Sequence, residues 1–403
     1  MPVANSLVVV GAGQAAAQLV ASLSQDGYAG EVTLIGDEPH LPYQRPPLSK
    51  KVLTGELTPD RLSVKPAAFY DKIGTRLRLD ARVERIDRVT KEVTLSDGSR
   101  IGFTTLVLAT GSRARTLPLQ GTGRTATFVL RSIADVAALR AQFAPGKALV
   151  VIGGGYIGLE LAAVAVKQEL EVTVLEQAPR VMARGVGPVV SRFYERLHHE
   201  EGVRLCMGSV VHGVEDGCVV CAGSEHRADL VLIGAGAVPN AELARESGLA
   251  TENGIVVDAE CRTSDPVIYA IGDCATQHHP LVGRRLRLES VHNALEQARI
   301  ASASICGKPA PAAQVPWFWS DQYDVKLQMA GLSDGYDQAV VRGDPDRGRS
   351  FAVFYLRDGV LIAVDAVNRL PEFMMSKQLI AGRARIDPAR LGDESIAVKD
   401  LKG

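Results

Sequence analysis

Leu7-Val-Val-Val-Gly-Ala-Gly-Gln-Ala-Ala16 is the stretch near the start of the chain that decides the fold. The run Leu7 to Val10 is apolar without alternation, which predicts a short strand buried on both faces of a parallel sheet. Gln14 to Leu23 then predicts a helix, and Glu31 to Ile35 predicts a second strand. Strand, glycine turn, helix and strand in this order form a βαβ unit.

The same order of elements returns in the middle of the chain. Lys147 to Ile152 predicts a strand, Gly153-Gly-Gly155 a turn, Tyr156 to Gln168 a helix and Val172 to Leu175 another strand. Two such units predict either two dinucleotide sites, or one site and a degenerate copy of it. We therefore expect an α/β protein with two Rossmann-like dinucleotide-binding domains.

The last part of the chain has a different texture. Alternating and aromatic runs from about Pro311 predict an antiparallel sheet, and Asp358-Gly359 predicts a hairpin turn within it. The expected domains are a discontinuous first nucleotide domain, a second nucleotide domain and a C-terminal α+β domain. Their predicted bounds are 1–112 with 238–310, 113–237, and 311–403.

Composition narrows the class of protein. A length of 403 residues is too long for one ordinary core, and a net charge of −1 argues against a nucleic-acid-binding protein. No basic stretch precedes the first apolar run, and no apolar run reaches the roughly 18 residues of a membrane span. The six cysteines are scattered, and Cys218 with Cys221 reads as a pair of ordinary strand cysteines. We expect a cytoplasmic enzyme with no metal site.

The first glycine turn has the spacing of a nucleotide-binding fingerprint. Gly11 permits a tight turn, Gly13 leaves room for a pyrophosphate, and Ala16 is small enough for close helix–strand packing. The helix that follows directs free N–H groups and a positive dipole end at the phosphates. Asp37 lies just beyond the second strand, where a ribose-binding carboxylate is expected.

The second glycine turn carries the complete fingerprint, Gly153-x-Gly155-x-x-Gly158. Glu176 ends its second strand, where it can accept hydrogen bonds from a ribose 2′-OH and would repel a 2′-phosphate. This favours NADH over NADPH. Arg180 or Arg184 reaching back to the ribose would favour NADPH instead.

Two further strings give the order of the two nucleotides by resemblance. Leu106-Val-Leu-Ala-Thr-Gly111 and Tyr269-Ala-Ile-Gly-Asp273 resemble the "ATG" and "GD" signatures of two-dinucleotide-domain flavoprotein reductases. In that superfamily the first fingerprint holds FAD and the second holds NAD(P), and the aspartate of the second string binds the ribityl chain. Disulfide reductases and NADH peroxidases of the superfamily need cysteine after the first βαβ unit. This chain has none before Cys206, which excludes both chemistries.

Other strings point to one branch of the superfamily. Arg45-Pro-Pro-Leu-Ser-Lys50 resembles the ferredoxin reductases of bacterial oxygenase systems, and also apoptosis-inducing factor. The strings 289–299, 316–322 and 392–396 are similar to the same ferredoxin reductases, so the likeness extends from end to end.

The resemblance assigns roles to particular residues. Tyr156 would cover the nicotinamide side of the flavin and swing aside for NADH. Lys50, paired with Glu160, would lie at the flavin edge, and Trp319 would lie between flavin and partner or simply in the core. The implied FAD contacts are Asp37, Arg45, Lys50, Val83, Thr110, Arg131, Asp273 and Val291, and the implied NAD contacts are Gly155, Ile157, Glu176 and Gly236.

Some residues depart from the family pattern or have no clear reading. Ala16 replaces the third glycine, which is permitted. Ser112-Arg113 has no interpretation at this point, and His292 either tunes the flavin or fills space.

The resemblance also implies an activity and a partner. NADH would give a hydride to FAD, and electrons would pass singly to an acidic 2Fe–2S ferredoxin that supplies a haem monooxygenase or a ring-hydroxylating dioxygenase. Docking would be transient, and the reductase would be a monomer or weak dimer. The resemblance makes Arg299 and Lys399 candidate contacts for the ferredoxin. The basic run that includes Arg284 and Arg285 is either a further contact or a solvated loop. The alternatives are an NADH-dependent rubredoxin or monodehydroascorbate reductase, or a redox sensor like apoptosis-inducing factor.

Overall fold

The computed structural model describes residues 5–120 and 125–401, and the chain divides into two compact units. Unit 1 comprises Met1–Gln44, Pro59–Arg113 and Val238–Gln314. Unit 2 comprises Arg45–Thr58, Ala114–Ala237 and Val315–Gly403. The division into three domains at the bounds given above stays a prediction.

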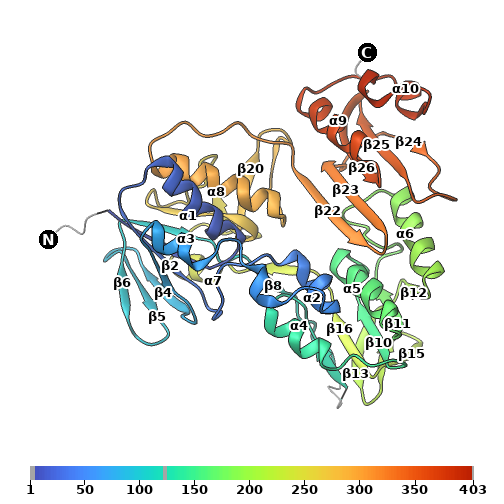
Figure 1. Ribbon diagram of the computed structural model, residues 1–403, viewed down its shortest axis with the longest axis horizontal. Helices are drawn as coiled ribbons and strands as arrows, with labels where there is room; N and C mark the ends of the chain where they lie inside the picture. Colours follow the sequence, from blue (N-terminus) through green and yellow to red (C-terminus); the bar gives the residue numbers. More distant parts are fainter. Residues whose placement is uncertain (1–4, 121–124, 402–403) are drawn as a thin grey trace. The chain divides into compact units, whose positions relative to one another are not determined.

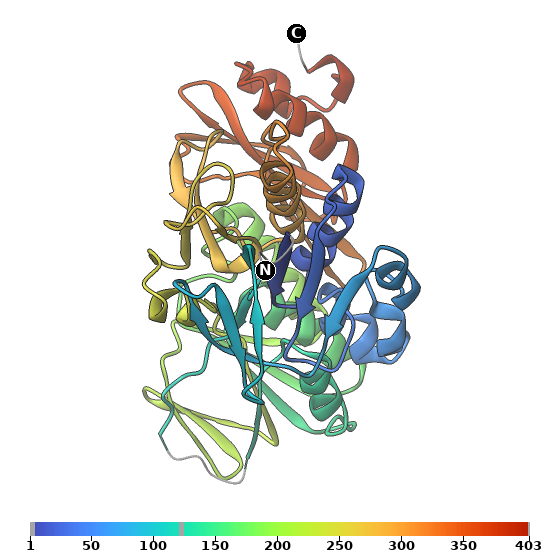
Figure 2. The same ribbon diagram turned by 90° about the vertical axis from the view of Figure 1, so that its left-hand side faces the viewer.

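Unit 1 is built on a parallel sheet with strand order β19-β7-β1-β2-β3. β1 and β2 pair in parallel, and they are the two dark blue strands beside the N-terminus in Figure 2. The bounds are β1 Ser6–Val10, β2 Glu31–Ile35, β3 Thr75–Arg78, β7 Thr105–Leu108 and β19 Ile268–Ala270. The first predicted βαβ unit is therefore present, with helix α1 (Gln14–Asp26) between its strands.

Both faces of this sheet are covered by other elements. Successive side chains of a strand point to opposite faces, so alternate residues of β1 belong to different cores. Leu7 and Val9 share a core with α1 and with α8 (Val291–Ile305), which lies beside α1 (Figure 1). Val8 and Val10 share a second core with an antiparallel sheet of β4 (Val83–Asp87), β5 (Glu92–Leu95) and β6 (Arg100–Gly102). This accounts for the continuous apolar run of β1.

Shorter elements complete unit 1 and the chain segments where it joins unit 2 in sequence. A three-stranded sheet of β18, β20 and β21 lies in the second half of the unit. The bounds are η2 Pro59–Leu62, α3 Ala67–Lys72, β8 Ser112–Ala114, β17 Ala237–Pro239, α7 Glu242–Glu246, β18 Ile255–Val257, η3 Gly272–Cys274, β20 Ala275–His279 and β21 Arg284–Leu286.

Unit 2 contains the second predicted βαβ unit, in a parallel sheet of strand order β12-β11-β10-β16-β9. One face of β10 shares a core with the antiparallel sheet β13-β14-β15. The strands are β9 Ala126–Phe128, β10 Ala148–Ile152, β11 Glu171–Glu176, β12 Arg204–Met207, β13 Val211–Glu215, β14 Cys218–Cys221, β15 Ser224–Arg227 and β16 Leu230–Ile233. The helices are η1 Pro46–Ser49, α2 Lys51–Thr54, α4 Ile133–Arg140, α5 Tyr156–Lys167 and α6 Pro188–Glu200.

The C-terminal part of unit 2 is the predicted antiparallel sheet, with strand order β22-β23-β26-β25-β24. Asp358 and Gly359 both have positive φ, 51° and 73°, as a tight hairpin turn requires. The bounds are β22 Trp317–Gln322, β23 Val325–Gly331, β24 Gln338–Gly343, β25 Phe351–Arg357, β26 Val360–Val367, α9 Leu370–Ala381, α10 Pro388–Gly392 and η4 Val398–Asp400. Strand β23 was not expected from the sequence. Within residues 5–120 and 125–401, no helix combines the length and apolarity that a membrane crossing requires.

Candidate functional site

The first glycine turn, in unit 1, has two glycines that are required for different reasons. Gly11 has φ +107°, and a Cβ there would lie closer than 3.0 Å to the carbonyl oxygen of Ala109. Gly13 has an ordinary φ of −103°, and a Cβ there would meet nothing within 4 Å. Packing therefore explains Gly11 but not Gly13. The open space at Gly13, in front of a helix that no side chain caps, fits a pyrophosphate.

The second glycine turn, in unit 2, repeats this geometry. Gly153 has φ +113°, with the carbonyl of Gly234 in the way of any Cβ. Gly155 has open space where a Cβ would be, and again no side chain caps the helix that begins at Tyr156. Gly158 has no room for a Cβ, which would lie closer than 3.0 Å to the carbonyl oxygen of Gly153. Each unit thus has open backbone in front of an uncapped helix N-terminus, the geometry that phosphate binding requires.

The two acids that the sequence predicts to bind ribose are held differently. Asp37 is exposed, two residues after β2 ends. Glu176 is the last residue of β11, and its carboxylate accepts N–H bonds from Gly154 at 2.6 Å and Ala178 at 2.7 Å. This fixes the Glu176 carboxylate at the lip of the second glycine turn, where a ribose is expected.

Arg180 is committed to its own loop. Its guanidinium donates to the carbonyl oxygens of Val186 at 2.7 Å and Ala183 at 2.9 Å, and to the hydroxyl of Ser191. The Arg184 guanidinium lies next to Gly236, 3.1 Å from where a Cβ would stand on that glycine. Among residues 125–401 neither arginine is paired with Glu176, which agrees with the expectation of NADH.

A polar cluster in unit 1 explains residues that the sequence left without a role. The Ser112 hydroxyl donates to the Asp273 carboxylate at 2.9 Å. Thr110 and Asn240 clasp each other: the Thr110 hydroxyl donates to the Asn240 backbone at 2.6 Å, and the Asn240 amide donates to the Thr110 backbone at 2.9 Å. Arg113 closes the cluster on Asn240 at 2.7 Å. The predicted FAD contacts Thr110 and Asp273 are thus held in fixed positions.

The predicted pair of Lys50 and Glu160 forms within unit 2. The Lys50 ammonium lies 2.6 Å from one carboxylate oxygen of Glu160, which also accepts from the Ser49 hydroxyl at 2.6 Å. The Glu160 side chain is 6% exposed and that of Lys50 is 20% exposed. A buried carboxylate is tolerated only when it is paired and hydrogen-bonded, as Glu160 is. The short segment of η1 and α2 thereby presents a fixed cation.

Tyr156 is held between the glycine turn and the C-terminal sheet of unit 2. Its ring lies 4.9 Å from the ring of Phe318, and its hydroxyl donates to the sulfur of Met329 at 3.2 Å. Its neighbour Ile157 is 45% exposed, which is unusual for a large apolar side chain and fits a residue that a ligand covers. Trp319 points to the other face of β22 from Phe318, and its ring lies 5.5 Å from that of Trp317.

The remaining predicted contacts lie as follows. In unit 1, Val83 is buried at the start of β4, Val291 begins α8, and Arg299, Arg284 and Arg285 are exposed. His292 is buried and bonds Gln314 at 3.0 Å, so it has a structural partner. In unit 2, Arg45 donates to the backbone carbonyl of Arg131 at 2.6 Å, and Lys399 is exposed.

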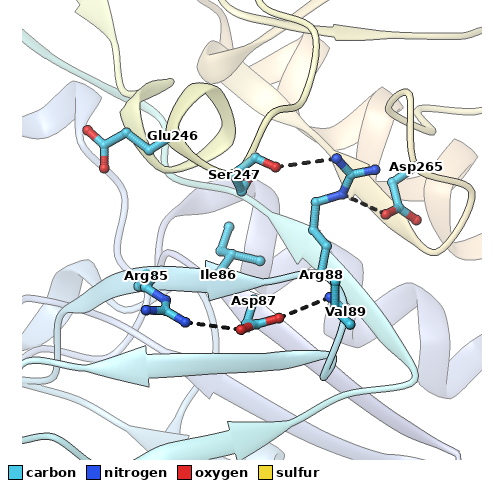
Figure 3. A pocket seen from close by; sticks show the side chains of 8 residues that line it. All are labelled: Arg85, Ile86, Asp87, Arg88, Val89, Glu246, Ser247 and Asp265. Atoms are coloured by element: carbon cyan, nitrogen blue, oxygen red, sulfur yellow. Dashed lines mark hydrogen bonds and ion pairs between the residues drawn. The ribbon is translucent and has the colours of Figure 1, made fainter.

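An open surface pocket of about 590 Å³ lies elsewhere in unit 1 (Figure 3). Its lining includes Arg88, which bonds the Asp265 carboxylate at 2.8 Å. The lining residues are Arg85, Ile86, Asp87, Arg88, Val89, Glu246, Ser247 and Asp265, none of them a predicted cofactor contact. The pocket is therefore separate from the candidate site.

Comparison with known proteins defines the class. Residues 5–298 match the family described as pyridine nucleotide-disulphide oxidoreductase, and residues 317–402 match the reductase C-terminal family. The chain therefore belongs to the pyridine nucleotide-disulphide oxidoreductases, a family that binds FAD and NADH. The chain has no cysteine before Cys206. It therefore lacks the cysteines after the first βαβ unit on which the disulfide chemistry of the family description depends.

The relatives narrow the class to NADH-dependent ferredoxin reductases of oxygenase systems. The putidaredoxin reductase of Pseudomonas putida is 44% identical over 98% of this chain and 96% of its own length. The ferredoxin–NAD(+) reductase component of the anthranilate 1,2-dioxygenase system of Burkholderia cepacia is 42% identical over 98% and 99%. The crystal structure of a covalent putidaredoxin reductase–putidaredoxin complex matches with a TM-score of 0.95 and 44% identity, covering 98% of each chain. The predicted fold class, family and cofactors are confirmed.

Proposed function

We propose that this chain takes a hydride from NADH onto FAD and passes the electrons singly to a small acidic 2Fe–2S ferredoxin. The observation that carries the proposal is the pair of glycine turns, each with open space where Gly13 and Gly155 lack a side chain. When bound, FAD supplies the chemistry that links a donor of two electrons to an acceptor of one electron at a time. The protein's part is to hold both nucleotides and to place charge beside the flavin.

Particular residues would do this work. Gly11, Gly13 and Ala16 would hold the FAD pyrophosphate, while Gly153, Gly155 and Gly158 would hold that of NADH. Glu176, fixed by two backbone N–H groups, would accept from the ribose 2′-OH. The Lys50 ammonium would favour the anionic reduced form of the flavin. Tyr156 would move aside when the nicotinamide arrives. These roles stay proposals.

A second part of the proposal concerns the ferredoxin. Arg299, Arg284, Arg285 and Lys399 have exposed positions, and positive side chains there would steer an acidic partner at low salt. The structural relative was crystallised as a complex with its own ferredoxin, putidaredoxin, which supports a partner of the same kind. We propose a transient complex, a cytoplasmic location and a monomer or weak dimer.

Anaerobic stopped-flow absorbance tests the proposal. The purified yellow protein is mixed with NADH or NADPH and then with a 2Fe–2S ferredoxin. We expect rapid bleaching of the flavin by NADH, slower bleaching by NADPH, and reduction of the ferredoxin within the same cycle. A protein that binds no flavin would refute the proposal. Electrons that stay on the flavin in a long-lived charge-transfer complex would instead support a redox sensor.

A further inference from the structure

A row of buried polar side chains in unit 2 ends on Glu160. It begins at Tyr323, whose hydroxyl lies 2.9 Å from Nδ1 of His198 on α6. Nε2 of His198 lies 2.8 Å from Oε1 of Gln322, and Nε2 of Gln322 lies 3.2 Å from Oγ of Ser320. Oγ of Ser320 lies 2.7 Å from Oε1 of Glu160. His198 and Ser320 are fully buried, so water does not compete for these bonds.

The row has one direction. Burial lowers the pKa of His198 to about 4, so its ring is neutral at physiological pH and carries a single N–H. With the Tyr323 hydroxyl donating to Nδ1, that N–H is on Nε2 and donates to Gln322. The Gln322 amide then donates to Ser320, which leaves the Ser320 hydroxyl hydrogen for Glu160. Each donor polarises the next toward the carboxylate.

Two structural features indicate that the row is built in. Strand alternation places Phe318, Ser320 and Gln322 on one face of β22, so the spacing Phe-x-Ser-x-Gln directs both polar side chains the same way. Tyr323 has φ 57° as the first loop residue of the hairpin that pairs Gln322 with Val325, and from this fixed turn its hydroxyl reaches His198.

Glu160 is the point where the row meets the cation. Its Oε1 accepts from Ser320, while its Oε2 accepts from Ser49 and Lys50. Without the hydrogen bond from Ser320 to Oε1, more of the negative charge of the carboxylate lies on Oε2. Oε2 then holds the Lys50 ammonium more tightly. Less of the positive charge of Lys50 is then available to any other group.

We propose that Ser320, Gln322 and His198 are positioning residues that set how much positive charge Lys50 presents to the flavin. The inference rests on the proposed function, which places Lys50 at the flavin edge. It extends that function to a row of side chains that leads from α6 to Glu160 and whose purpose the reaction itself does not explain.

The test compares Ser320→Ala with a matched control. Ser376→Ala makes the same change at another fully buried serine of unit 2, whose hydroxyl has no hydrogen-bond partner in the part of the chain that the structure describes. We expect Ser320→Ala to lower the midpoint potential of bound FAD and to slow its reduction by NADH about tenfold, with KM for NADH unchanged. Ser320→Thr, which keeps the hydroxyl, should restore both values.

A second pair tests the far end of the row without a cavity. Tyr323→Phe removes the hydroxyl that bonds His198, and Tyr194→Phe removes a buried hydroxyl that has no partner in the described ranges. We expect a smaller fall in potential for Tyr323→Phe and none for Tyr194→Phe. Potentials of Ser320→Ala and Ser376→Ala that agree within error would overturn the proposal. A parent protein that holds FAD but is not reduced by NADH would instead overturn the proposed function.

Discussion

The two glycine turns share a fingerprint but place their acids differently. The register of both sheets is the same: Val10 pairs with Ile35, and Ile152 pairs with Leu175. The next residues, Gly36 and Glu176, therefore occupy equivalent places.

What differs is the residue that faces each of these places. Ala12 faces Gly36 in the first turn, and a Cβ on Gly36 would lie closer than 3.0 Å to the Cβ of Ala12. Gly154 faces Glu176 in the second turn, and a Cβ on Gly154 would lie 3.2 Å from the Cβ of Glu176. Only one member of each facing pair carries a side chain. The choice moves the acid from the strand end, as Glu176, to one residue further on, as Asp37.

The largest expected effect concerns the third small residue of each turn. Gly158→Ala would drive its Cβ into the Gly153 carbonyl, and we expect a loss of about 3 kcal/mol or more in the free energy of unfolding. Ala16→Gly makes the reverse change in the first turn and should cost about 1 kcal/mol through helix propensity. Urea unfolding measures both. Equal losses would mean that the two turns pack alike.

The second prediction separates binding from folding. Gly13→Ala and Gly155→Ala add a methyl group to open space at ordinary φ, so we expect unfolding free energies within about 1 kcal/mol of the parent. We expect Gly13→Ala to weaken FAD retention and Gly155→Ala to weaken NADH binding, each about a hundredfold. Flavin release on dilution and stopped-flow NADH titration measure them. If each variant weakened both nucleotides, the assignment of one turn to each would be wrong.

A smaller effect is expected from the facing pair itself. Gly154→Ala places a Cβ against Glu176 and Val181, so the Glu176 carboxylate must shift from the lip of the turn. We expect about a tenfold weaker NADH affinity and a lower ratio of NADH to NADPH activity, with FAD retained. The control is Ala12→Gly in the first turn, which removes a methyl group and should leave the nucleotide preference unchanged.

The smallest effect is a pH dependence that involves only the second turn. The loop that follows β11 is tied to Gly154 by the Met182 N–H, and its Gly187 N–H donates to the Tyr355 hydroxyl at 3.1 Å. Tyr355 donates in turn to Asp365 at 2.6 Å. Burial raises the pKa of Asp365 from 3.8 to about 7.

Between pH 3.8 and about pH 7 the folded state therefore holds a proton on Asp365 that the unfolded chain has lost. Its stabilising contribution is complete below pH 3.8 and is lost as the pH rises through about 7. Between pH 6 and pH 8 we expect the parent to lose about 1 kcal/mol of unfolding free energy relative to Asp365→Asn. Denaturant unfolding at each pH measures these free energies. If the unfolding free energies of the two proteins changed equally between pH 6 and pH 8, the raised pKa of Asp365 would be contradicted.

The local part of this structure was predictable, and the long-range part was not. The turns at Gly11 and Gly153 follow from spacing alone, because their constraints arise within a few residues. Strand β23 was missed although Val325 to Gly331 alternates and pairs with the preceding strand β22. Its place in the middle of the sheet depends on its other partner, Val360–Val367, which lies far along the chain.

The same limit applied to the site. The Lys50–Glu160 pair was expected only because a family resemblance supplied it. The Ser320–Gln322–His198 row, the clasp of Thr110 by Asn240 and the Ser112 bond to Asp273 join residues far apart in sequence. No local pattern marks such partners.

The interleaving of the two units has a consequence for synthesis. Strand β19 pairs with β7, and α8 covers α1, yet both β19 and α8 are made long after their partners. At ordinary translation rates the β7 edge and the apolar side of α1 stay uncovered for roughly ten to fifty seconds. During that interval the nascent chain presents an open strand edge and uncovered leucines, which makes this half of the protein a natural client for ribosome-associated chaperones.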